Sequence, residues 1–133
     1  MKPVFADTFY FIALLHVDDA RHAAAAAYAA AAGRLVGTTV WVLTEVADGL
    51  APYGARTQFE VLLQSLNSDS QTEVVPADQS LWDRGVELYN DRPDKEWSLT
   101  DCISFIVMRD RNLTDALTGD HHFEQAGFHA LLK

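Results

Sequence analysis

The sequence predicts an α/β fold built around a mostly parallel sheet. Short apolar segments of strand length alternate with longer segments in which apolar residues recur every three or four positions. This alternation is typical of parallel strands joined by helical crossovers. The 133 residues, 49% of them apolar, can bury one hydrophobic core, and no linker or repeat of fixed period divides them. We therefore expect a single domain over residues 1–133.

The first half of the chain predicts two strands and four helices. Val4–Ala6 is expected to form a buried strand, followed by an apolar helix over residues 8–16. The alanine run predicts a helix that begins at Asp18 or Asp19 and continues to residue 32, where Gly33 ends it. The remaining elements of this half are a strand at residues 35–36, a helix from Thr38 or Thr39 that breaks at residues 52–54, and a helix over residues 56–66.

The second half predicts three strands that alternate with three helices. Pro76 should end the first of these strands, because proline cannot donate a hydrogen bond to a sheet. A polar loop over residues 92–97 separates the two long helices. The expected elements are strands at residues 73–76, 116–118 and 128–132, and helices at residues 79–90, 98–111 and 121–126.

Composition excludes several classes of protein. The net charge of −9 is incompatible with a general nucleic-acid coat, which needs an excess of Lys and Arg to neutralise phosphates. Cys102 is the only cysteine, so neither an intramolecular disulfide nor a multi-cysteine metal site can form. The apolar stretches are shorter than the roughly 20 residues of a membrane span, and the N-terminus has no signal-peptide pattern. A cytoplasmic protein that does not enter a membrane is therefore expected.

Four acidic residues stand out by position, although each also has an ordinary structural explanation. Asp7 and Asp120 each follow a predicted strand and precede a helix, where an aspartate can cap the helix. Asp101 lies three residues after Ser98 in a capping-box pattern. Glu45 lies within an apolar helix and could simply occupy its solvated face.

Taken together, the four acids indicate a metal site. Ligands of open parallel sheets bind beyond the carboxyl ends of the strands, which is where Asp7 and Asp120 are expected. Clustered carboxylates repel one another unless a cation offsets their charge. Carboxylate oxygens suit Mg²⁺ or Mn²⁺, and two such ions can hold the attacking and leaving oxygens of a phosphodiester.

These acids lie within segments that resemble a known family. The chain is similar to PIN-domain ribonucleases of the bacterial, VapC-like toxin type, and the similarity extends over essentially its whole length. The matching segments are residues 4–8, Glu45, residues 97–105, residues 116–123 and residues 126–128.

The resemblance implies a three-layer α/β/α sandwich with an acidic pocket for one or two Mg²⁺ or Mn²⁺ ions. It makes Asp7, Glu45, Asp101 and Asp120 the metal ligands and catalytic residues, with Thr8 and Thr118 as polar neighbours of those ligands. It further implies hydrolysis of RNA to 5′-phosphate and 3′-hydroxyl products. As partners it implies a second copy of the chain and a small antitoxin.

Other residues carry weaker signals. Arg92 and Lys95 precede the Asp101 helix and are candidates for RNA binding, although solvated charges are ordinary in turns. His121 and His122 follow Asp120, where either could approach a metal, but they lack the spacing of paired helical metal ligands, so a metal role is disfavoured and their role stays open.

Three alternative functions share parts of this pattern. A phosphate-accepting receiver domain is disfavoured, because it needs a lysine after a late strand, and Lys95 precedes a helix. A PIN-fold binding module without catalysis is disfavoured by the presence of all four acids. A PIN nuclease of RNA processing that lacks an antitoxin stays open.

Overall fold

The computed structural model describes residues 2–31, 33–52 and 54–133. In these residues five strands form one sheet in the order β3-β2-β1-β4-β5, and every neighbouring pair is parallel. The α/β fold with a parallel sheet is therefore confirmed. The strands are β1 (Val4–Ala6), β2 (Val36–Thr39), β3 (Thr72–Val75), β4 (Asp115–Leu117) and β5 (His129–Ala130).

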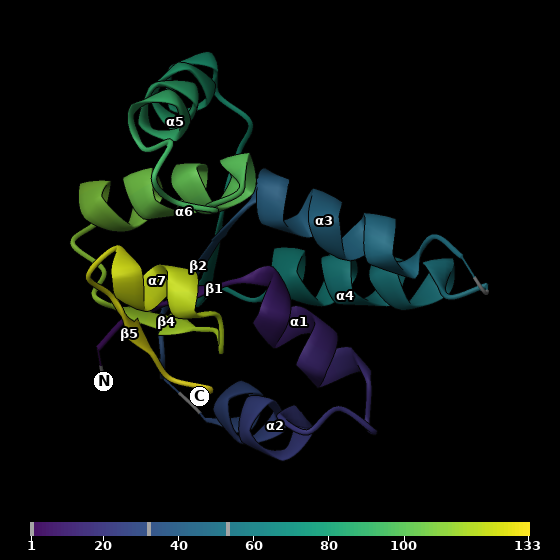
Figure 1. Ribbon diagram of the computed structural model, residues 1–133. Coiled ribbons are helices and arrows are strands. Elements are labelled where there is room, and N and C mark those ends of the chain that lie inside the picture. The colour runs from purple at the N-terminus through teal and green to yellow at the C-terminus, as the bar shows by residue number, and fades with distance from the viewer. Residues whose placement is uncertain (1, 32, 53) are drawn as a thin grey trace.

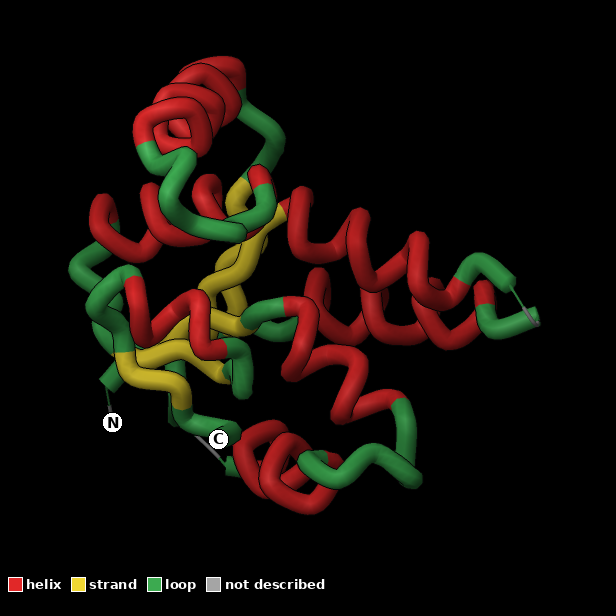
Figure 2. Tube along the Cα trace, in the orientation of Figure 1, coloured by secondary structure: helices red, strands yellow, loops and turns green. Residues whose placement is uncertain are grey.

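Helices cover both faces of the sheet (Figures 1 and 2). Helices α1, α2 and α4 lie on one side, and α6 and α7 lie on the other, with α5 packed outside α6. Helix α3 contacts α1, α4 and α6 and so connects the two layers. The helices are α1 (Thr8–Leu15), α2 (His22–Ala30), α3 (Val40–Leu50), α4 (Arg56–Ser68), α5 (Gln79–Asp91), α6 (Leu99–Asp110) and α7 (His121–Gln125). None of the helices in the described ranges has the length and apolarity needed to cross a membrane.

The order of the strands creates a crevice beside β1. Strands β2 and β3 are added on one side of β1, whereas β4 and β5 are added on its other side. Right-handed crossovers then place the connecting helices on opposite faces, and their ends separate above the junction of β1 and β4. Ligands of doubly wound sheets bind in such a crevice, at the carboxyl ends of the strands.

A buried aromatic cluster fixes helix α6 and the loop that precedes it. The ring of Phe105 lies 5.0 Å from the rings of both Trp97 and Phe123, in edge-to-face geometry. At Gly85, helix α5 approaches α6 so closely that an added Cβ atom would overlap with the Ile103 side chain. The first turn of α6 is consequently held at a defined position above the sheet.

Three elements differ most from the sequence prediction, and the bounds of the others lie within two residues of it. Helix α2 begins at His22, because Asp19 accepts a hydrogen bond from the backbone of Arg21 in a turn and does not cap a helix. Strand β2 is Val36–Thr39, not residues 35–36, and its last residue, Thr39, caps α3. Strand β5 is limited to two residues that pair with β4.

Two details of the prediction lie outside the described residues. The first is the expected end of the alanine helix at Ala32; α2 as described ends at Ala30. The middle residue of the expected break at residues 52–54, Tyr53, is the other.

Candidate active site

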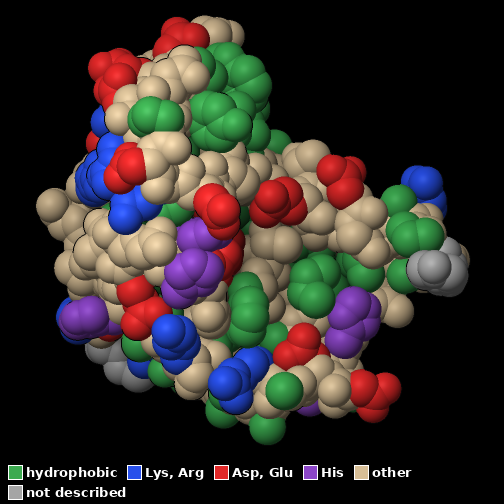
Figure 3. Space-filling model, in the orientation of Figure 1, with side chains coloured by type: hydrophobic (Ala, Val, Ile, Leu, Met, Phe, Trp, Pro, Cys, Tyr) green, Lys and Arg blue, Asp and Glu red, His purple; other side chains and the backbone are tan. Residues whose placement is uncertain are grey.

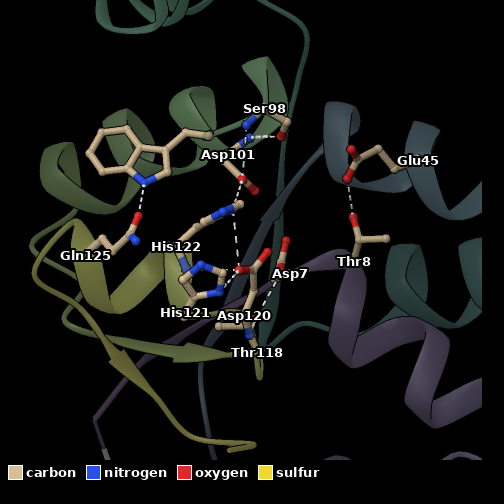
Figure 4. A network of polar contacts seen from close by, with 11 residues as sticks. Asp7, Thr8, Glu45, Ser98, Asp101, Thr118, Asp120, His121, His122 and Gln125 are labelled. Atoms are coloured by element: carbon tan, nitrogen blue, oxygen red, sulfur yellow. Dashed lines mark hydrogen bonds and ion pairs between the residues drawn. The ribbon is translucent and has the colours of Figure 1, made fainter. Parts of the chain in front are cut away.

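The four predicted acids line one pocket at the carboxyl edge of the sheet. Its volume is about 370 Å³. Figure 4 shows the carboxylates of Asp7, Asp101 and Asp120 close together, with Glu45 approaching from α3 on the opposite side. The lining residues are Asp7, Thr8, Phe9, Glu45, Glu96, Ser98, Asp101, Asp120 and His122.

Asp7 is the most deeply buried of these acids, with 5% of its surface exposed. It holds the position before α1, but its side chain does not cap the helix, so the simple capping explanation is wrong. Its Oδ2 instead accepts a hydrogen bond of 2.9 Å from the hydroxyl of Thr118, which follows β4. Burial raises the pKa of Asp7 to about 7, and the charges of Asp101 and Glu45 act in the same direction.

Asp101 serves as a helix cap and faces the pocket at the same time. Its backbone N–H donates to the Ser98 hydroxyl over 3.0 Å, and its Oδ2 accepts from the Ser98 backbone N–H over 3.2 Å. The predicted capping box is therefore present. Asp101 is nevertheless only 9% exposed. Burial raises the pKa of its carboxyl group, and the negative charge of Asp120 acts in the same direction. Capping accordingly orients a carboxylate that remains available to a cation.

Asp120 also combines both roles. Its Oδ1 accepts a 2.9 Å hydrogen bond from the His122 backbone N–H and so caps α7. The His122 ring lies between two acids, with Nδ1 3.2 Å from Oδ2 of Asp101 and 3.4 Å from Oδ1 of Asp120. The ligand atoms of Asp120, His121 and His122 all lie within 4.8 Å of one another.

Glu45 is held by the first helix. The Thr8 hydroxyl donates a hydrogen bond of 2.6 Å to Oε1 of Glu45 across 37 positions in sequence. Glu45 is half-buried at the pocket, so the alternative of a solvated outer face is wrong. Thr8 and Thr118 thus both contact acidic residues of the pocket, as the resemblance implied.

Sequence reasoning missed two residues of this pocket, Phe9 and Glu96, and gave His122 too little weight. Glu96 lies next to the segment that carries Asp101, and His122 lies within the segment that carries Asp120, which is the signal that was available. Phe9 packs against Gly119, where an added Cβ atom would lie only 2.5 Å from Cζ of the ring. A glycine is therefore required before Asp120 if Phe9 is to reach the pocket.

Arg92 and Lys95, the predicted RNA-binding residues, lie outside this pocket but next to it. They line an adjacent cavity that shares Glu96 with the acidic pocket. The surface in Figure 3 shows acidic and histidine side chains gathered at its centre. One group of Lys and Arg side chains lies to the left below α5, with acidic side chains beside it, and other basic side chains lie at the lower edge and at the far right.

The donor set fits a hard divalent cation. Every predicted ligand offers carboxylate oxygen, and two of the carboxylates are largely buried with raised pKa values. A buried group of like charges is stabilised when a cation binds among them. Nucleases of the PIN family generally depend on divalent metal ions.

Comparisons with known proteins agree with this site and fold. The model of the PIN domain family matches residues 4–129. The chain is 32% identical over 126 residues to the "23S rRNA-specific endonuclease VapC20" of Mycobacterium tuberculosis strain H37Rv, covering 94% of this chain and 95% of that protein.

Solved structures extend the similarity. The crystal structure of Mycobacterium tuberculosis VapC20, described as a sarcin–ricin loop cleaving toxin, matches with a TM-score of 0.85 and 26% identity over 98% of this chain and 99% of that chain. FitAcB from Neisseria gonorrhoeae matches in fold alone, with a TM-score of 0.64 and 17% identity over 98% and 96% of the chains. The VapC-like resemblance inferred from the sequence is confirmed, and this chain belongs to the PIN domain family.

Proposed function

We propose that this protein is an endoribonuclease that hydrolyses RNA phosphodiesters with Mg²⁺ or Mn²⁺, and that it is the toxin of a toxin–antitoxin pair. The ribonuclease class expected from the sequence is confirmed by its relatives. The observation that carries the site assignment is the convergence of Asp7, Glu45, Asp101 and Asp120 in one pocket at the junction of β1 and β4. The named relatives act on 23S rRNA and its sarcin–ricin loop, so a hairpin RNA with that loop is the first substrate to test.

The proposed role of the four acids is to hold the divalent cation. Bound there, the cation would lower the pKa of a water molecule and offset the charge of the phosphodiester. Thr118 keeps Oδ2 of Asp7 in a single orientation, and Thr8 does the same for Oε1 of Glu45. His122 lies between Asp101 and Asp120 and sets their separation.

Two alternatives are less well supported. A binding module that has lost catalysis would have no reason to bury Asp7 at the cost of raising its pKa. A nuclease of RNA processing without an antitoxin would use the same pocket, but the similarity to VapC20 over nearly the whole chain supports the toxin. A substrate in ribosomal RNA would place the activity in the cytoplasm.

We expect the purified protein to cleave the hairpin RNA in Mg²⁺ or Mn²⁺ and to lose all activity in EDTA. Ca²⁺ should bind yet support little turnover, because its larger and more flexible coordination shell positions a nucleophile poorly. The measurement is gel electrophoresis of end-labelled RNA, with 5′-phosphate and 3′-hydroxyl ends on the products. Undiminished cleavage in EDTA by a preparation free of contaminating nuclease would contradict the metal assignment.

We further expect a homodimer in solution, as the family resemblance and the small-residue surface of α2 suggest. Sedimentation equilibrium at micromolar concentration should give twice the 14.7 kDa of the chain. A mass of one chain at that concentration would rule out the dimer.

We expect the antitoxin to place an arginine at the acidic pocket, because a guanidinium pairs with carboxylates through two parallel hydrogen bonds.

A further inference from the structure

A second cavity opens beside the acidic pocket. It has a volume of about 360 Å³ and lies between the end of α5 and the loop that leads into α6. Glu96 lines both cavities, so the two are adjacent. The second cavity is therefore within reach of a nucleotide that neighbours a phosphodiester at the carboxylates.

One wall of the cavity is an exposed aromatic ring. Tyr89, on the last turns of α5, has 49% of its surface exposed. The floor is rigid, because Trp97 is buried and its indole N–H donates to Oε1 of Gln125 over 3.0 Å. The Arg92 guanidinium covers Trp97 at 5.1 Å from the ring and is itself held by two hydrogen bonds to Asp94. The floor is thus formed before any ligand binds.

Lys95 supplies a cation that has no close ion pair. Arg92 is paired with Asp94, whereas the Lys95 ammonium has no carboxylate within 4.0 Å among residues 2–31, 33–52 and 54–133 and interacts with Asp94 only at longer range. In a chain of net charge −9, a lysine without a close ion pair beside the acidic pocket is well placed to attract a phosphate.

We propose that this cavity binds the nucleotide next to the cleaved phosphodiester. The base stacks on Tyr89, and Lys95 contacts a neighbouring phosphate. Asn90, which also lines the cavity, hydrogen-bonds through its amide to the edge of the base. This assignment rests on the proposed ribonuclease function and extends it to a second subsite. Single-stranded RNA suits the cavity, because only an unstacked base can present its face to an aromatic side chain.

Kinetics with paired variants test the subsite. We expect Tyr89→Ala to raise KM for the hairpin RNA about tenfold with kcat nearly unchanged, in line with the loss of one base–aromatic stack. Tyr89→Phe should retain the KM of the wild type, because it keeps the aromatic face. Trp82→Ala is the matched control, since Trp82 is 42% exposed on the same helix, seven residues before Tyr89, but does not line the cavity.

Salt dependence tests Lys95 separately. Lys95→Ala should reduce the slope of log Kd against log salt concentration by about 0.7, the value for one phosphate contact on single-stranded RNA. Lys2→Ala is the control, because Lys2 pairs with Asp115 at the opposite end of the sheet. Binding is measured by fluorescence anisotropy of the labelled hairpin in Ca²⁺.

Photo-crosslinking separates failure of the subsite from failure of the proposed function. RNA with 4-thiouridine beside the cleaved bond should crosslink to the tryptic peptide of residues 85–95, which contains Tyr89 and is not cut after Arg92 because Pro93 follows it. Three results together would overturn the subsite alone: the wild type cleaves RNA, the Tyr89→Ala and Lys95→Ala variants behave like the wild type, and the RNA crosslinks to other peptides. Wild type that crosslinks through this peptide but cleaves no RNA in Mg²⁺ or Mn²⁺ would overturn the nuclease function and support the subsite.

Discussion

Asp7→Asn is expected to lower the rate of RNA cleavage by at least about a hundredfold, a typical effect of removing one electrostatic contact from an active site. Asparagine keeps the size of the side chain and can still accept the hydrogen bond from Thr118. It removes the negative charge from the most buried acid of the pocket. The loss of activity would therefore report on charge and not on misfolding. Single-turnover cleavage of the hairpin RNA in saturating Mn²⁺ measures it.

Asp48→Asn provides the matched control for this experiment. Asp48 lies on α3, one turn beyond Glu45, but it is exposed and does not line the pocket. The Asp48→Asn variant should cleave RNA at the rate of the wild type. If Asp7→Asn cleaves within tenfold of the wild-type rate, Asp7 does not hold the cation and the site assignment fails.

Without divalent cations, the wild-type protein is expected to become less stable between about pH 4 and pH 7. The pKa of Asp7 is raised to about 7 in the folded protein from 3.8 in the reference state, so the folded state binds more protons than the unfolded state in this range. Its contribution to stability is fully present below the unfolded pKa and is lost as the pH rises through the folded pKa. At about 1.4 kcal/mol per pKa unit, the free energy of unfolding should fall by roughly 4 kcal/mol.

Asp7→Asn should remove most of this pH dependence. At pH 8 in EDTA the variant should melt on the order of 10 °C above the wild type, given the unfolding entropy of a chain of this size. Added Mn²⁺ should stabilise the wild type and have a much smaller effect on the variant. Thermal unfolding followed by circular dichroism, in EDTA and in Mn²⁺ across this pH range, measures both effects. A variant that melts below the wild type in EDTA at pH 8 would show that the Asp7 charge is not destabilising.

The two results together distinguish a metal site from structural carboxylates. If an aspartate serves only the fold, neutralising it should lower the stability of the protein and leave its activity unaffected. If an aspartate is a metal ligand, neutralising it should raise the stability of the metal-free protein and lower its activity, because the buried charge is destabilising until the cation binds. Asp48→Asn should change neither property.

The sequence alone determined the order and type of the elements, because these depend on local patterns. Apolar spacing predicted α4 and α5, and the capping box predicted the start of α6 at Ser98. The boundary errors arose where a local signal was ambiguous. Asp19 is of a residue type that favours helix N-caps, but it lies in a turn. Thr39 is both the last residue of a strand and the N-cap of the next helix.

Only the tertiary structure decided what the acids do. Asp7 and Asp101 both stand at helix starts in the sequence, yet the Asp101 carboxylate completes the capping box of its helix, whereas that of Asp7 turns toward Thr118, 111 positions away. Glu45 and Thr8 meet in the same way across 37 positions. Such distant contacts depend on β1 pairing with both β2 and β4, which no local pattern encodes. Burial, which raises the pKa of Asp7, arises from that same pairing and from the packing around it, because desolvation is a property of the assembled fold and not of any one segment.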